Sequence, residues 1–151
     1  MDIVLISAIA WAVAQFTKLT LSYIEHRKFD WSLITSSGGF PSAHSAFVTC
    51  LVTQIGFVEG FRTSIFALAI GFWSVVIYDS FNVRRAVGIQ AQTLNRIGEG
   101  FSETTGEPYT PIKEILGHTP FQVLCGILLG VFIALMRIQF LPFLLTRLPM
   151  I

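Results

Sequence analysis

Four apolar stretches constrain the fold of this chain more than any other feature. They run over residues 3–16, 46–58, 64–78 and 121–136. Each is shorter than the roughly 20 residues that a helix needs to cross the hydrocarbon core of a bilayer, but mixed flanking residues extend each one. The pattern predicts an all-α fold, a small integral membrane bundle of about four transmembrane helices.

The composition supports this interpretation. Of the 151 residues, 53% are hydrophobic and 13% are charged, about half the charged share of a soluble globular domain. The formal net charge of +1 argues against a nucleic-acid partner held by charge. Cys50 and Cys125 lie in apolar surroundings, where a small buried hydrophobe is expected rather than a metal ligand. We expect one membrane domain over residues 1–151.

The predicted spans cover residues 3–25, 42–59, 63–81 and 119–138, and a predicted interfacial segment covers residues 84–117. Inside that segment, Thr110 and Pro111 predict the start of a short helix that Gly117 would end. Thr119, Pro120 and Gln122 predict a second helix start with a capping box. The long third connection should therefore carry short interfacial helices.

Alternating spans place residues 26–40 and 82–118 on the same side of the membrane. That side holds more Lys and Arg than the other, which predicts that its loops are cytoplasmic. A phosphate site would need the same cations whichever way it faced. On the last span, Gly126 and Gly130 form a small-residue stripe that could pack within the chain or against a second subunit.

Two polar clusters flank the second and third spans. At the first, two glycines would let the backbone approach a ligand closely, and Pro41 with Ser42 as N-cap predicts a helix start whose N–H groups could bind an anion. His44, in the first turn of that helix, could donate a proton. The alternative is a helix start with no ligand. At the second, Asp79 ends an apolar run, and either Arg84 or Arg85 could neutralise it or bind phosphate. The alternative there is a structural ion pair.

A third cluster holds Lys113, Glu114 and His118, and Lys18 lies near the end of the first span on the same side. Together the clusters gather two histidines and several cations at one level of the membrane. This constellation suits phosphoryl transfer through a histidine, with cations holding the phosphate and a second imidazole protonating the leaving oxygen.

The sequence resembles the divergent PAP2 family, which is related to type 2 phosphatidic acid phosphatases and vanadium haloperoxidases. The similarity is carried by four segments, residues 39–45, 78–85, 90–95 and 113–120. It implies that His118 is the nucleophile and that residues 41–44 form the Pro-Ser-x-His motif, with His44 as its acid partner. Ala43 stands where that motif has Gly.

The sequence also departs from the wider superfamily. Gln122 stands where an Asp would orient the nucleophile, and Lys113 is the nearest cation before His118, where an Arg is expected. A carboxylate would then have to come from Asp79 or Glu114, or the chemistry differs. The superfamily phosphatases need no metal, so no cofactor and no metal ligand are predicted, although the two carboxylates leave room for a divalent ion.

The sequence thus predicts a membrane phosphatase acting on a lipid phosphate monoester of the phosphatidylglycerol phosphate or phosphatidic acid type. The expected catalytic residues are His118, His44 and Asp79. The expected substrate-binding residues are Lys18, Ser42, Arg84, Arg85, Lys113 and Glu114. The expected partner is a phospholipid in the bilayer. The alternative is a non-catalytic protein that binds or transports a phospholipid or polyprenyl phosphate.

Overall fold

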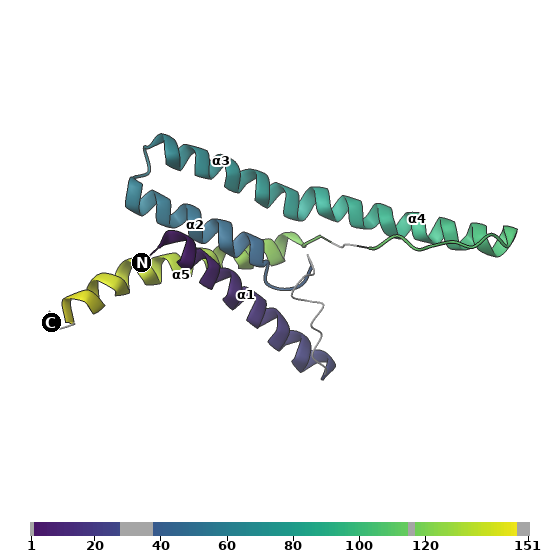
Figure 1. The fold of residues 1–151 in the computed structure, drawn as a ribbon, viewed down its shortest axis with the longest axis horizontal. Helices are drawn as coiled ribbons and strands as arrows, with labels where there is room; N and C mark the ends of the chain where they lie inside the picture. Colours follow the sequence, from purple (N-terminus) through teal and green to yellow (C-terminus); the bar gives the residue numbers. More distant parts are fainter. Residues whose placement is uncertain (1, 28–37, 115–116, 148–151) are drawn as a thin grey trace.

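The computed structural model describes residues 2–27, 38–114 and 117–147, with side chains through residue 140. These residues form helices and no strand, which confirms the all-α fold (Figure 1). The helices are α1 (Ile3–His26), α2 (Ala43–Glu59), α3 (Ser64–Tyr78), a π-helical turn (Asp79–Val83), α4 (Arg84–Thr105) and α5 (Pro120–Arg147).

Helix α2 lies at the centre of the bundle and packs against α1, α3 and α5. Its contact with α5 depends on two glycines. A Cβ atom on Gly126 would lie 2.4 Å from the Ser42 carbonyl oxygen, and one on Gly130 would lie 2.5 Å from the Ala46 carbonyl oxygen. Close backbone approach at small residues is typical of membrane helices. The glycine stripe is therefore packed against α2 within the chain, and a homo-oligomer stays a prediction.

Length and exposure agree with a membrane bundle. Among the described residues, three helices are long and apolar enough to cross a bilayer: Ile3–His26, Ser64–Thr105 and Pro120–Phe140. Helix α2 has 17 residues, the lower end of the spanning range. Large apolar side chains such as Leu68 and Val75, which are 74% and 68% exposed, face outward, as expected for a surface that lipid covers.

Helices α3 and α4 run as one rod through the π-helical turn (Figure 1). The rod has 42 residues, so it is about 63 Å long, twice the thickness of a hydrocarbon core of about 30 Å. In this arrangement α4 extends past the other helices. The interfacial position of residues 84–117 stays a prediction. In that position, α4 would have to bend away from α3 at the π-helical turn.

The chain returns along α4 after Gly106 (Figure 1). The short helix predicted to begin at Pro111 is wrong for residues 106–114, which are not helical. The reason is a competing set of hydrogen bonds. The N–H of Ile112 donates to Asn95 Oδ1 and its carbonyl accepts from Asn95 Nδ2, so this backbone pairs with a side chain of α4.

The fold predicts unequal effects of adding one methyl group at two glycines. Gly126→Ala places a Cβ against backbone atoms of α2 and should lower the free energy of unfolding by about 1–3 kcal/mol. Gly71→Ala meets nothing within 4 Å and should be neutral or slightly stabilising. Unfolding in detergent, followed by circular dichroism, measures both. Equal stability of the two variants would contradict the close contact between α2 and α5.

Candidate functional site

The two candidate histidines lie at the same end of the bundle because the starts of α2 and α5 are joined. The Ser42 N–H donates to the Gln122 carbonyl at 3.1 Å, and the rings of Phe40 and Phe121 stack with centroids 5.8 Å apart. His44 lies in the first turn of α2, and His118 lies two residues before the start of α5.

Three contacts fix the backbone at His118. Its N–H donates to the Ser80 carbonyl, in the π-helical turn, at 3.1 Å. Before it, a Cβ on Gly117 would lie 2.5 Å from the backbone nitrogen of Arg85, so only glycine fits. After it, Thr119 and Gln122 form the predicted capping box: the Thr119 N–H donates to Gln122 Oε1 at 2.9 Å, and the Gln122 N–H donates to Thr119 Oγ1 at 3.3 Å.

His118 is 2% exposed, and neither nitrogen of its imidazole has a hydrogen-bond partner among the residues that the structure describes. Buried polar atoms are rarely left without partners in folded proteins. Burial first, and then the positive charges of Lys18, His44 and Arg84, lower the pKa of His118 from 6.5 to about 4. At neutral pH the ring is therefore uncharged, and one of its nitrogens carries a free lone pair.

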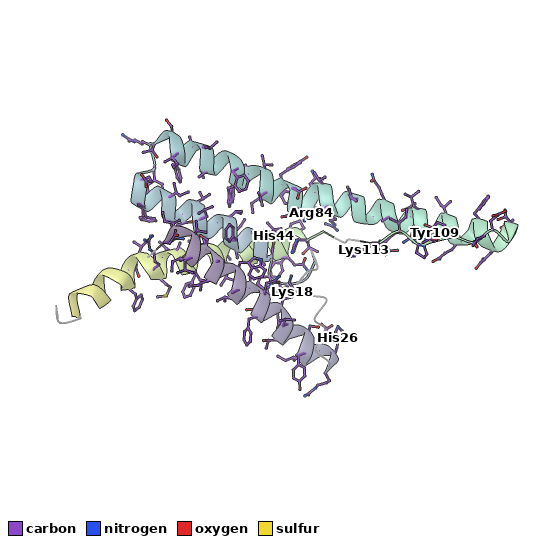
Figure 2. All side chains as sticks on the ribbon, in the orientation of Figure 1. Lys18, His26, His44, Arg84, Tyr109 and Lys113 are labelled. Carbon is purple, nitrogen blue, oxygen red and sulfur yellow. The ribbon has the colours of Figure 1, made fainter. Side chains whose placement is uncertain are left out.

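The charged groups that help to lower the pKa of His118 come from different helices. Lys18 of α1 is 5% exposed, and its carbon chain lies against Gly39, whose positive φ of 97° and close approach both require glycine. Arg84 begins α4, and its Nε donates to Asp79 Oδ2 in an ion pair. Figure 2 shows Lys18, His44 and Arg84 converging on this end of the bundle.

Other residues predicted for the site have different surroundings. Ser42 is completely buried, and its hydroxyl accepts from the Ser45 N–H and hydroxyl, so it caps α2 and faces no open site. Arg84 and Arg85 are both exposed, but Arg84 is the arginine whose charge acts on His118. Lys113 lies on the chain that returns along α4, farther from the histidines than Arg84 (Figure 2).

The carboxylate expected beside the nucleophile is not bonded to it. Asp79 pairs with Arg84, and Glu114 accepts from Asn95 Nδ2 at 2.8 Å. Gln122, which replaces the superfamily Asp, is used in the capping box. Among the residues that the structure describes, no three His, Cys, Asp or Glu side chains come together as metal ligands would. That the protein needs no cofactor stays a prediction.

Asn95 has no role predicted from the sequence, yet it is 6% exposed and makes four hydrogen bonds to the returning chain. A signal was present in the spacing. Gly88, Ala91, Asn95 and Gly98 recur every three or four residues and form a narrow face of small side chains on one side of α4. Such a face favours close packing of another backbone.

The helices and this cluster define an integral membrane protein with a buried histidine among cationic side chains. The chain matches the model of the divergent PAP2 family over residues 1–133, and it belongs to that family. It is 36% identical over 148 residues to the uncharacterized membrane protein YuiD of Bacillus subtilis (strain 168), a match that covers 90% of this chain and 94% of that protein. No solved structure matches the chain.

The low pKa of His118 predicts a pH dependence of stability. The folded state binds a proton less readily than the unfolded state, so its free energy of unfolding falls as pH drops from 6.5 through about 4. The loss due to His118 is about 2–3 kcal/mol after allowance for screening. Unfolding of the wild type and His118→Gln in detergent at pH 7 and pH 4 measures it. The same pH dependence in both proteins would refute the assignment.

Proposed function

We propose that this protein is a membrane-embedded phosphatase that hydrolyses a lipid phosphate monoester, of the phosphatidylglycerol phosphate or phosphatidic acid type, through His118. The observation that carries the proposal is the uncharged, unbonded His118 imidazole beside Lys18, His44 and Arg84. A nucleophilic nitrogen with cations around it matches the needs of phosphoryl transfer. Membership of the divergent PAP2 family supports the same reaction class.

In the proposed reaction, Lys18 and Arg84 hold the phosphate oxygens. An imidazole nitrogen of His118 attacks phosphorus, an N–P bond forms and the P–O bond to the lipid breaks, while His44 gives a proton to the leaving oxygen. Water then attacks phosphorus and breaks the N–P bond, and His44 takes the proton that the water loses. The products are inorganic phosphate and a lipid alcohol. Asp79 would act through Arg84, by orienting its guanidinium.

A lipid substrate is favoured by the surface next to His44. A groove of about 330 Å³ is lined by Ala8 and Trp11 of α1 and by His44, Phe47 and Val48 of α2. Its lining is apolar except for His44. Since apolar groups favour an acyl chain and the cations favour a phosphate, a lipid phosphate would satisfy both neighbouring surfaces.

The second candidate function is binding or transport of a lipid phosphate without turnover. One observation favours it: no carboxylate among the described residues is bonded to His118. Gln122, at the position of the superfamily Asp, caps α5 instead. The cationic cluster would still attract a phosphate group. This function differs from the first in releasing no inorganic phosphate.

The proposal predicts how substitutions change phosphate release from phosphatidic acid and phosphatidylglycerol phosphate. His118→Ala should abolish turnover because the nucleophile is lost, and His44→Ala should lower kcat by about 100-fold or more because the proton donor is lost. Arg84→Lys should weaken substrate binding, since an ammonium cannot form the bidentate contact of a guanidinium. The purified proteins are assayed in mixed micelles.

His26 provides the matched control, because it is exposed and lies at the end of α1 (Figure 2). His26→Ala should release phosphate at the wild-type rate. Wild-type turnover by His118→Ala would exclude the nucleophile assignment. Binding of the lipid phosphates by a wild-type protein that releases no phosphate would favour the transport function instead.

We also propose that the site faces the cytoplasm, because Arg84, Arg85, Arg96 and Lys113 lie at its end of the bundle. In a Cys125→Ser background, Glu103→Cys should resist a membrane-impermeant thiol reagent in whole cells. Arg62→Cys, in the exposed turn between α2 and α3, should react readily. The reverse labelling pattern would reverse the orientation.

A further inference from the structure

The amide of Asn95 holds the returning chain against α4 through every polar atom of its side chain. Its Oδ1 accepts from the Tyr109 hydroxyl at 2.7 Å and from the Ile112 N–H at 2.8 Å. Its Nδ2 donates to the Ile112 carbonyl at 2.9 Å and to Glu114 Oε1 at 2.8 Å. Two acceptor and two donor positions are all the amide has. Every hydrogen-bond donor and acceptor of the Asn95 side chain is therefore satisfied.

The face of α4 around Asn95 is shaped to receive this chain. Gly88, Ala91 and Asn95 are the buried residues of α4. At Gly98 a Cβ would lie 2.3 Å from the Tyr109 ring, and at Gly117 it would lie 2.5 Å from the Arg85 nitrogen. Glycines thus allow close contact near both ends of the returning chain, and Asn95 supplies the polar contacts between them.

We infer that Asn95 is a positioning residue for His118: it clamps residues 109–114 onto α4 and so delivers the His118 imidazole to Lys18, His44 and Arg84. Glu114, proposed from the sequence as a substrate ligand, belongs to this clamp. The clamp shares α4 with Arg84, so one helix carries both a cation of the site and the anchor for its histidine. The inference depends on the proposed function only where turnover is measured.

The clamp complements the contacts at His118 itself. The His118 N–H bond to the Ser80 carbonyl and the capping box after it fix the chain on the side of α5 and the π-helical turn. On the other side, the described hydrogen bonds of residues 109–114 are those to Asn95. Without them, one end of the connection is unanchored, and the imidazole should gain access to water.

The test is an NMR titration of the full chain in detergent, with histidine labelled and the three signals assigned from single His→Gln variants. In the wild type, the His118 signal should titrate near 4. In Asn95→Ala it should move up toward 6.5, because the ring leaves its buried position beside Lys18, His44 and Arg84. Gln90→Ala is the matched control, since Gln90 is an exposed amide on the same helix.

A variant that adds a charge separates positioning from general loss of structure. Asn95→Asp should also raise the His118 titration point, because two donors are lost and a carboxylate then faces Glu114. Adding Glu114→Gln supplies a donor to that carboxylate, so the double variant should recover part of the shift. Gln90→Glu controls for the added charge. Turnover of Asn95→Asp should fall by about 100-fold if His118 is misplaced by about 1 Å.

The outcomes distinguish this inference from the proposed function. An unchanged His118 titration in folded Asn95→Ala and Asn95→Asp overturns the positioning role, even if turnover falls. A shifted titration in a protein whose wild type releases no phosphate supports the positioning role and refutes the phosphatase. If both Asn95 variants fail to fold, Tyr109→Phe, which removes one of the four bonds, should give a smaller shift in the same direction, and no shift would overturn the inference.

Discussion

The close backbone approach of α2 and α5 is the contact on which the rest of the structure depends. Gly126 and Gly130 bring α5 against the carbonyls of Ser42 and Ala46, and the Ser42 N–H bond to Gln122 then aligns the two helix starts. This alignment places the first turn of α2 near His118, two residues before α5 begins. Without it, His44 and His118 would not act on one another electrostatically. The packing of small residues in the membrane therefore decides the geometry of a polar site at its edge.

Local signals in the sequence were sufficient for much of this arrangement. Ser42 as an N-cap and the capping box of Thr119 and Gln122 were predicted because each depends on residues three positions apart. Four alternating apolar stretches also predicted that Lys18, His44, Arg84 and His118 lie at one end. What local signals could not reveal was competition over long sequence distances. Thr110 and Pro111 have the local pattern of a helix start, but the backbone of Ile112 bonds to Asn95, which precedes it by 17 residues.

His118 is the residue of the site whose burial is least favourable in free energy. A fully buried imidazole without a hydrogen bond gives up solvation, and the nearby cations make protonation still less favourable. Capping, a tight glycine contact and a bond to the π-helical turn hold the ring there. A phosphate group would offset the repulsion among Lys18, Arg84 and a protonated histidine.

The long rod of α3 and α4 also gives this small protein a site at which a rigid domain can be inserted. Helix α4 has 22 residues, so its tip at Gly106 lies about 33 Å from its first turn, and a side chain at Gly106 would meet no neighbouring atom within 4 Å. A chain of 16.8 kDa presents few features for particle alignment in electron cryomicroscopy. A rigid domain inserted at this tip would lie far from the histidine cluster, and the helix that carries it would fix its orientation to the bundle.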